Sequence, residues 1–264
     1  MVCDEKNGGL SVIKIEETEV SGWEAAIRGA RNPMNSWDRS DSYWDWISEH
    51  PPMSPTDEGW EYVLGENDLK LAKSLSKAGS DHGKFLRMIN VSVDITAPLY
   101  FWKEFKTYRN GRKFGDNEPE IMPCDFLEYD IEMNSCSTMH KIHAKEFELD
   151  DFSHEHLTEG LLDAVLKPTI AVLNTTREAY LNYDELSKDD PDGWDEGITC
   201  KKDIWWHMIQ LLPSSYNQKR TVQLNYQVLK SMYFARRHHK LDEWREFCAW
   251  CESLPYFKEI CIQE

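Results

Sequence analysis

Apolar and polar residues alternate with two different periods along the chain, and these periods predict strands and helices. A period of two across residues 91–96 predicts a half-buried strand. A similar run within residues 1–20 predicts an edge strand, and residues 221–224 predict another strand. Helical spacing of apolar residues occurs in five segments: 65–78, 97–108, 156–180, 200–212 and 241–254. Together these elements predict a single, mixed, helix-rich α+β domain over residues 1–264.

Individual residues mark the ends of several of these elements. Gly79 is expected to end the helix over 65–78, because glycine readily adopts a left-handed cap. Pro98 suits the first turn of the next helix. Asn225 is placed as the N-cap of a helix that follows the strand over 221–224. The last helix places one apolar face toward the core: Leu241, Trp244, Phe247, Cys248, Cys251 and Leu254.

Two segments show neither period. Residues 31–64 are rich in Pro, Ser, Asp and Trp, and we expect a long irregular region. The four tryptophans of that region need cover, so we expect it to be packed. Residues 109–133 contain two Gly, two Pro and many acidic residues, which predicts a loop or an insertion over 110–133.

Composition and charge narrow the class of protein. With 264 residues and 41% hydrophobic content, the chain can bury a real core. No run approaches the roughly 18 apolar residues of a membrane span, and the polar N-terminus does not resemble a secretory signal, so we expect a cytoplasmic protein without a membrane partner. Seven cysteines, an odd number, favour reduced thiols over a disulfide framework.

The net charge of −17 excludes duplex nucleic acid as a partner, because such binding depends on neutralising phosphates. A small anionic ligand remains compatible with this charge, since a local Arg and Lys cluster acts at short range. Solubility alone also explains an acidic composition.

The sequence lacks both Gly-rich phosphate-binding patterns, so a dinucleotide would have to be held in another way. Cys248 and Cys251 form a lone C-x-x-C on an apolar helix face, which favours core packing over a zinc site. Four histidines lie near one another without a recognised zinc motif, and we predict no metal: His140, His143, His154 and His156.

The strongest candidate for a site is the polar stretch within residues 211–237. Asn225 and Arg236 are 11 residues apart, and 11 helical steps of about 100° return to nearly the same face. Hydroxyl, amide and basic side chains just upstream offer many donors to a phosphate-bearing ligand. A solvated turn followed by an amphipathic helix explains the same pattern, and the residues alone leave both interpretations open.

The segment QLLPSSYNQKRTVQLNYQVLKSMYFARRHHKLDEW resembles the C-terminal signature of flavin-dependent thymidylate synthases. The matching positions are Leu212-Pro213, Thr221, Asn225, Arg236 and Asp242-Glu243-Trp244. The segments NSCSTMHKIHAKEF and SDHGKFLRMINVSVDITAPLYFWKEF are similar to phage-encoded members of this family. Together the matches cover about two thirds of the chain, and they are most specific at its C-terminal end.

This resemblance implies a thymidylate synthase complementing protein-like fold with a central antiparallel sheet, in a homotetramer that binds FAD. It also implies conversion of dUMP to dTMP, with methylenetetrahydrofolate and NADPH as co-substrates, in the cytoplasm of a host cell if the chain is phage-encoded. The implied catalytic residues are Arg236, which polarises the uracil ring, and Ser137, near the reacting carbon. The implied substrate-binding residues are Arg236, Ser137, Glu104 and Arg220, and the implied cofactor-binding residues are Arg109, Asn134 and Asn225.

Several positions depart from the family's motifs. Thr107 and Tyr108 replace the first Arg and the His of an Arg-His-Arg motif, Ser135 replaces a Glu, and Glu104 replaces a Gln that contacts the substrate. The family's Arg-Tyr becomes Met139-His140, and the Arg before Leu-Pro becomes Ile209. Two alternatives therefore stand beside thymidylate synthesis: a non-catalytic nucleotide-binding or interaction protein on the same scaffold, and an enzyme that modifies another pyrimidine deoxynucleotide.

Overall fold

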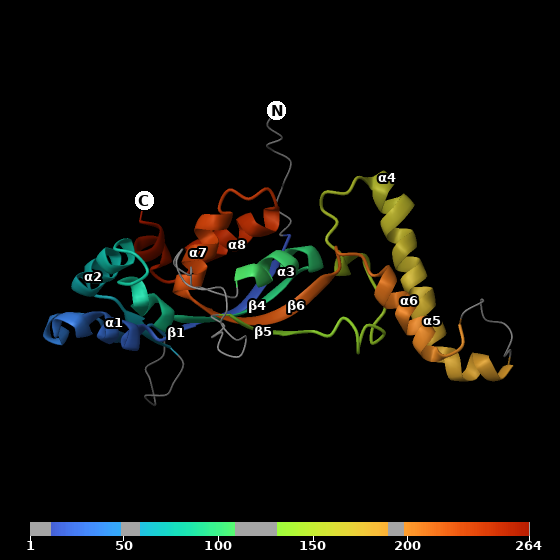
Figure 1. The fold of residues 1–264 in the computed structure, drawn as a ribbon, viewed down its shortest axis with the longest axis horizontal. Coiled ribbons are helices and arrows are strands. Elements are labelled where there is room, and N and C mark those ends of the chain that lie inside the picture. The colour runs from blue at the N-terminus through green and yellow to red at the C-terminus, as the bar shows by residue number, and fades with distance from the viewer. Residues whose placement is uncertain (1–11, 49–58, 109–130, 190–197, 264) are drawn as a thin grey trace, which may run out of the picture. The chain divides into compact units, whose positions relative to one another are not determined.

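The computed structural model of the chain describes residues 12–48, 59–108, 131–189 and 198–263. A four-stranded sheet has the strand order β1-β4-β6-β5, and a smaller sheet pairs β2 with β3 (Figure 1). The strands within the described residues are β1 (Lys14–Ser21), β2 (Tyr43–Trp46), β3 (Trp60–Val63), β4 (Asn90–Pro98), β5 (Glu132–Ser135) and β6 (Asn217–Asn225). The predicted α+β class with a central antiparallel sheet is confirmed. The edge strand predicted within residues 1–20 is β1.

The chain divides into two compact units, which we describe separately. The first comprises Met1–Lys14, Ile95–Lys106 and Asn134–Arg220, and the second comprises Ile15–Asp94, Thr107–Met133 and Thr221–Glu264. The α-helices of the first unit are α3 (Leu99–Phe105), α4 (Glu159–Leu161), α5 (Lys167–Asp189) and α6 (Lys201–Leu211). Those of the second are α1 (Trp23–Arg31), α2 (Glu66–Lys77), α7 (Tyr226–Arg236) and α8 (Asp242–Ser253). The single domain over residues 1–264 stays a prediction.

In the first unit, α5 and α6 lie side by side (Figure 1). A π-helical turn, η7 (Leu162–Leu166), joins α4 to α5. The helices and the preceding loop bury one apolar cluster, formed by Ile142, Phe147, Phe152, Leu166, Ile170, Leu173 and Met208. The helices predicted over 156–180 and 200–212 are therefore present, and their apolar stripes meet in this cluster.

In the second unit, the structure confirms the predicted start of α7 and the predicted end of α2. Asn225 caps α7, because its Oδ1 accepts a hydrogen bond from the Val228 amide at 3.0 Å. Gly79 has a φ of +105°, a left-handed conformation that favours glycine, and it follows the end of α2. The predicted apolar face of α8 is buried at Trp244, Phe247, Cys248, Cys251 and Leu254. Burial raises the pKa of the Cys248 thiol to about 11, as expected for a core cysteine.

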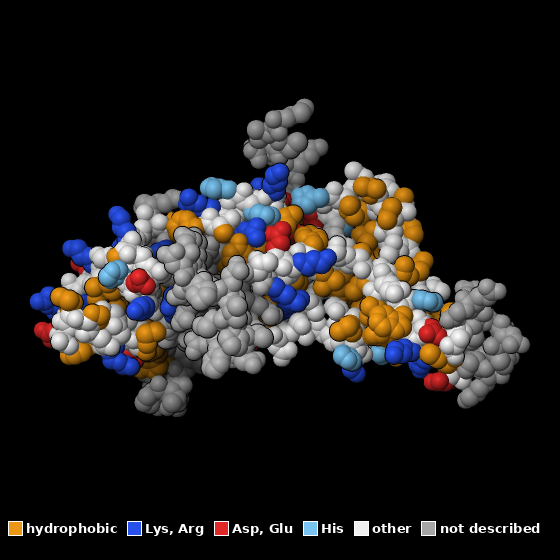
Figure 2. Space-filling view, in the orientation of Figure 1, with side chains coloured by type: hydrophobic (Ala, Val, Ile, Leu, Met, Phe, Trp, Pro, Cys, Tyr) orange, Lys and Arg blue, Asp and Glu red, His pale blue; other side chains and the backbone are white. Residues whose placement is uncertain are grey.

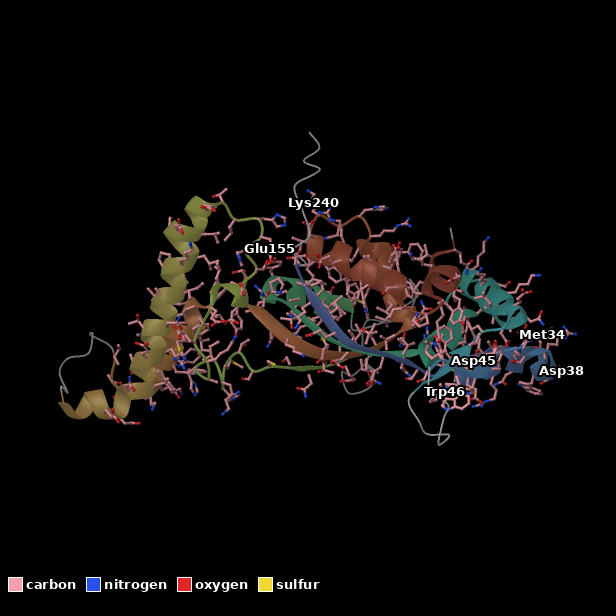
Figure 3. The ribbon with its side chains drawn as sticks, turned by 180° about the vertical axis from the view of Figure 1, so that it is seen from behind. Met34, Asp38, Asp45, Trp46, Glu155 and Lys240 are labelled. Carbon is pink, nitrogen blue, oxygen red and sulfur yellow. The ribbon has the colours of Figure 1, made fainter. Side chains whose placement is uncertain are left out.

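Within residues 31–48 and 59–64, which the structure describes, regular elements are present, so the prediction of a long irregular region is wrong there. The segment contains two 3₁₀ turns, η1 (Asn32–Met34) and η2 (Trp37–Arg39), and the antiparallel pair β2–β3. Met34 and Asp38 mark the two turns in Figure 3, and Asp45 and Trp46 mark β2. The sequence obscures the strands because β2 exposes aromatic residues in consecutive positions, without a buried face of period two.

The expectation that the four tryptophans of this region are packed is also wrong for most of them. Trp37, Trp44 and Trp60 are 51%, 52% and 38% exposed. The rings cover one another in part, since the ring centroids of Trp46 and Trp60 lie 5.3 Å apart in an edge-to-face arrangement.

A buried carboxylate anchors the chain just before β2. Asp68, on α2, is fully buried and accepts a hydrogen bond from the Arg31 Nε at 2.6 Å. It also accepts hydrogen bonds from both the amide and the hydroxyl of Ser42, at 3.1 and 2.6 Å. Ser40 and the Asp41 amide donate to the same carboxylate. These bonds tie α1, α2 and the start of β2 together.

Two element boundaries differ from the prediction. β6 begins at Asn217 instead of Thr221. The apolar pattern does not reveal its first residues, because the side chains at its first buried positions, Gln218 and Arg220, are polar. The helix predicted over 97–108 is α3, with Pro98 at its N-cap position, followed by a 3₁₀ turn over Lys106–Tyr108. The predicted insertion over 110–133 lies outside the described residues as far as residue 130.

Candidate functional site

In the first unit, β6 and α3 hold Arg220 in a fixed position. Arg220 is 7% exposed, and its guanidinium carbon lies 4.5 Å from the centroid of the Trp102 ring. Its Nε and one terminal nitrogen donate to the Gln218 Oε1 at 3.1 and 2.7 Å. Trp102 is itself fixed, because its indole N–H donates to the carbonyl oxygens of Ala97 and Gln218. The ring and the carboxamide therefore orient one buried guanidinium.

Gln218 also connects this arginine with the loop after β5. The Gln218 side-chain NH₂ donates to the Cys136 carbonyl at 2.5 Å, and the Cys136 amide donates to the Lys219 carbonyl at 3.0 Å. Ser137 follows directly, and its hydroxyl accepts hydrogen bonds from the amides of Met139 and His140. Ser137 is exposed, so its hydroxyl orders a tight turn at the surface. The structure thus brings the segment that carries Ser137 beside the strand that carries Arg220.

The remaining predicted residues of the first unit lie on neighbouring elements. Asn134 is exposed on β5, and Glu104 is half-buried on α3. Arg109, which the resemblance implies as a cofactor-binding residue, lies outside the described residues.

In the second unit, Arg236 is the last residue of α7 and is half-buried between two aromatic rings. Its guanidinium carbon lies 5.2 Å from the centroid of the Tyr108 ring and 4.9 Å from that of Trp244. A guanidinium that stacks on aromatic faces is oriented without losing its positive charge, and its N–H groups point outward from its edge. Tyr108 therefore contacts the predicted catalytic arginine.

Asn225 and Arg236 lie at opposite ends of α7. At about 1.5 Å per residue, the 11 residues of α7 separate these ends by about 16 Å. Asn225 is 6% exposed, and its carboxamide oxygen is engaged in capping the helix. A pyrimidine bound at Arg236 would therefore not reach Asn225, whereas a longer ligand along α7 would span both. Their shared role in binding stays a prediction.

The sequence analysis did not predict that Trp102 and Gln218 contact Arg220. Trp102 looks like an ordinary apolar helix residue, and nothing in its spacing indicates that it faces an arginine. Gln218 carried a usable signal, because it lies two residues before Arg220 and a strand places such residues on one face.

The histidines and cysteines that the structure describes are not gathered into a metal-binding arrangement. Among the described residues, no group of three or more His, Cys, Asp or Glu side chains is placed to hold a metal ion. Burial lowers the pKa of His143, and the positive charges of Lys141, Arg177 and Lys201 act in the same direction. Its ring packs against Tyr180 at 4.7 Å between centroids, so His143 is a neutral packing residue near pH 7. No helix in the described parts of the chain is long and apolar enough to cross a membrane.

The fold is that of an α+β protein with the architecture of flavin-dependent thymidylate synthases. The chain is similar to a crystal structure of the flavin-dependent thymidylate synthase ThyX from Helicobacter pylori in complex with FAD and dUMP, with a TM-score of 0.54 and 16% identity. That comparison covers 94% of this chain and 98% of the other. A second ThyX structure from Helicobacter pylori, also with FAD and dUMP, gives a TM-score of 0.56 and 15% identity over 95% and 97% of the two chains.

No protein-family model and no curated protein matches the sequence. At 15–16% identity the structural similarity establishes the fold, and the residues of the site have to carry the argument about function.

Proposed function

We propose that this chain is a flavin-dependent thymidylate synthase-like methyltransferase that converts dUMP to dTMP with methylenetetrahydrofolate and NADPH. The observation that carries the proposal is the similarity of fold to two crystal structures of Helicobacter pylori ThyX with FAD and dUMP, over at least 94% of the chain. Two fixed arginines, in a chain of net charge −17, add the chemistry that an anionic substrate needs.

Arg236 has the central role in the proposed reaction. Tyr108 and Trp244 orient its guanidinium before a ligand arrives, so binding requires little reorganisation. A fixed cation beside the uracil ring would stabilise negative charge that develops on the ring as its C5 carbon is attacked. The resemblance also implies substrate contacts for Ser137, near that carbon, and for Arg220 and Glu104. Glu104 must be turned away from the phosphate, since a carboxylate repels an anion.

The residues implied for flavin binding fit a flavin in part. A carboxamide donates and accepts hydrogen bonds, as the polar edge of an isoalloxazine ring requires. Asn134 is exposed, whereas the buried Asn225 already uses its oxygen to cap α7, which leaves its NH₂ group as a donor. That Asn134, Asn225 and Arg109 bind FAD is implied by the resemblance to the family. Bound FAD supplies the redox chemistry of the reaction, and the chain's own residues bind and orient the reactants.

A second candidate is a nucleotide-binding protein that has kept the scaffold without catalysis. The observation that favours it is Tyr108, which replaces a motif histidine and packs against both Arg236 and Trp244. A position that serves the reaction in the family has here become part of an aromatic cluster. The same replacement is compatible with a catalyst for a different pyrimidine deoxynucleotide.

The experiment that separates these candidates begins with the absorption spectrum of the purified protein. The proposal expects a flavin band, a rise in the melting temperature on addition of FAD, and rescue of a thymidine-requiring strain. Arg236→Ala should abolish the rescue and weaken dUMP binding about 10- to 100-fold, because it removes charge-assisted hydrogen bonds. Arg237→Ala is the matched control, since that neighbouring guanidinium lies 5.1 Å from the Phe234 ring instead.

A protein that binds dUMP and FAD without rescuing growth would favour another pyrimidine as substrate. A colourless protein that FAD does not stabilise would favour the non-catalytic candidate. Equal effects of the Arg236 and Arg237 substitutions would refute the role proposed for Arg236.

The first unit also supports a homo-oligomer, for which we propose a tetramer. Apolar side chains gather over α4 and α5 (Figure 2). Leu161, Val165 and Val172 are 49%, 56% and 50% exposed, and their spacing of four and seven residues forms one stripe. Because such a stripe is costly in water, a second copy of the chain is its proposed cover. Light scattering of Val172→Glu should show smaller particles than the unsubstituted protein, whereas an unchanged mass would exclude this stripe from the contact.

A further inference from the structure

The second unit contains a cavity of about 790 Å³ that the proposed reaction does not use. It lies between the end of β1, the start of α1, the β2–β3 pair and the end of α8. None of the residues assigned above to the nucleotide or the flavin lines it. Its walls carry five aromatic side chains: Trp23, Trp44, Trp60, Tyr62 and Trp250.

These aromatic residues are fixed in a way that leaves ring surface for a ligand. The Trp44 indole N–H donates to the Glu24 Oε2 at 3.3 Å, and the Trp250 indole N–H donates to the Thr18 hydroxyl at 3.1 Å. Trp44 and Tyr62 meet edge to face, with their centroids 5.2 Å apart. Since the protein already occupies both indole donors, these rings interact with a ligand mainly through their π surfaces. Trp44 and Trp60 keep 52% and 38% of their surface exposed.

The charges around the cavity favour a cation. Glu24 and Glu61 line it together with one guanidinium, that of Arg28, which leaves one net negative charge among these three residues. Burial raises the pKa of Tyr62, and the negative charges of Asp68 and Glu24 further disfavour its ionised form. The chain as a whole carries a net charge of −17, which raises the local concentration of cations.

Aromatic faces and carboxylates together recognise one class of ligand. A ring face attracts a cation through its quadrupole, and tryptophan does so most strongly. An anionic ligand would face two carboxylates against one guanidinium, and a neutral apolar ligand would gain nothing from Glu24 and Glu61. We propose that this cavity binds a small organic cation of the quaternary ammonium class, with its methyl groups against the indole rings and Glu24 and Glu61 balancing its charge.

The test compares choline with 3,3-dimethylbutan-1-ol, an uncharged molecule of nearly the same shape. The full chain is titrated with each compound, and tryptophan fluorescence and calorimetry report binding. We expect choline to bind and the alcohol to bind at least about 10-fold more weakly, with choline affinity falling as salt increases. Equal affinity for the two compounds, or no binding of choline, would overturn the proposal.

Variants assign the binding to this cavity. Trp60→Leu should weaken choline binding roughly 2- to 30-fold, the range of a single cation–π contact. Glu24→Gln and Glu61→Gln keep the shape of the side chains and should also weaken it, whereas Arg28→Gln should strengthen it. Trp206→Leu is the control, because this tryptophan is 43% exposed on α6, in the first unit.

Far-UV circular dichroism and the melting temperature establish that each variant is folded. If Trp60→Leu is unfolded, the two Glu→Gln variants decide the question, since they remove charge and no volume. Choline binding that survives both of them with unchanged affinity would refute the assignment. No flavin or nucleotide is added to the titrations, and none of the residues proposed for the reaction lines the cavity, so a failure of the proposed methyltransferase function does not affect their outcome.

Discussion

Replacing Asp68 by Ala tests how the second unit holds its two-stranded sheet. Asp68 is fully buried, and Arg31, its ionic partner, is 4% exposed. The Asp68 carboxylate accepts hydrogen bonds from Arg31, from Ser40, and from both donors of Ser42. The Ala variant leaves a buried guanidinium without its carboxylate and releases the segment that leads into β2.

The expected loss follows from the burial of this ion pair. Removing one partner of a buried pair costs about 3–5 kcal/mol, because the remaining charge stays desolvated. Asp68→Asn keeps the shape and one acceptor oxygen, so its cost should be smaller, about 1–3 kcal/mol. Asp38→Ala is the control, since Asp38 is exposed on η2 (Figure 3) and such surface changes stay within about 0.5 kcal/mol.

Urea unfolding gives the free-energy differences, and hydrogen exchange of the Asp41 and Ser42 amides reports the local effect, because both amides donate to Asp68. We expect fast exchange at these amides in Asp68→Ala, together with weaker choline binding, since Trp44 lies on β2. A loss of less than about 1 kcal/mol with protected amides would refute the reasoning.

The same carboxylate predicts a pH dependence. Burial alone would raise the pKa of Asp68, but hydrogen bonds from Ser42, Ser40 and Arg31 outweigh burial and lower it. A lowered pKa in the folded state means that the stabilisation is present above the unfolded value of about 3.9. It is lost as the pH falls through the folded pKa. Stability should thus decline less steeply in acid for Asp68→Asn than for the unsubstituted protein.

Two further predictions concern buried side chains. At pH 8, iodoacetamide should alkylate the exposed Cys136 and Cys200 at least about 10-fold faster than Cys248, because burial raises the pKa of the Cys248 thiol to about 11. Site-resolved mass spectrometry measures the three rates of alkylation. Equal rates would contradict the burial of Cys248 in the core. Gln218→Leu should cost roughly 2–4 kcal/mol, because it removes the acceptor of two Arg220 hydrogen bonds. The double variant Gln218→Leu/Arg220→Met should recover most of that loss in urea unfolding, and a double variant as unstable as the sum of both single variants would count against this account.

The parts of the fold that could be predicted from sequence are those where one physical effect dominates. The strand over 91–96 and the helix over 241–254 show regular burial, so their apolar periods directly report the core. Asn225 was predictable because a carboxamide before a helix has one favourable task, to accept a bond from a free amide. The β2–β3 pair was missed because its tryptophans do not alternate between core and solvent. Two of them contact each other, and two line the aromatic cavity.

The candidate site was predictable only in part, for a related reason. Arg220 and Arg236 are basic residues in an acidic chain, but their orientation depends on aromatic partners that spacing does not reveal. Trp102 and Tyr108 lie far from these arginines in sequence, and Trp244 belongs to the next helix, α8. Sequence spacing along α7 predicted that Asn225 and Arg236 lie on one face, three turns apart, but it did not indicate that Tyr108 and Trp244 contact Arg236. Contacts between distant segments are set by packing, which a local pattern does not contain.

The buried positions of β6 carry apolar side chains in its second half and polar side chains in its first half. Val222 and Leu224 are fully or almost fully buried, as in any core strand, whereas Gln218 and Arg220 occupy the equivalent alternate positions two and four residues earlier. Apolar residues at 218 and 220 would build such a strand at no cost in desolvation, so stability alone does not account for a buried amide and a buried guanidinium. The pair is held by specific partners, the Trp102 ring and the Cys136 carbonyl, which fix a positive charge beside the loop that carries Ser137. A buried fixed charge beside a hydroxyl-bearing loop destabilises the fold but can bind an anionic ligand. This arrangement supports the proposal that a nucleotide binds next to β6.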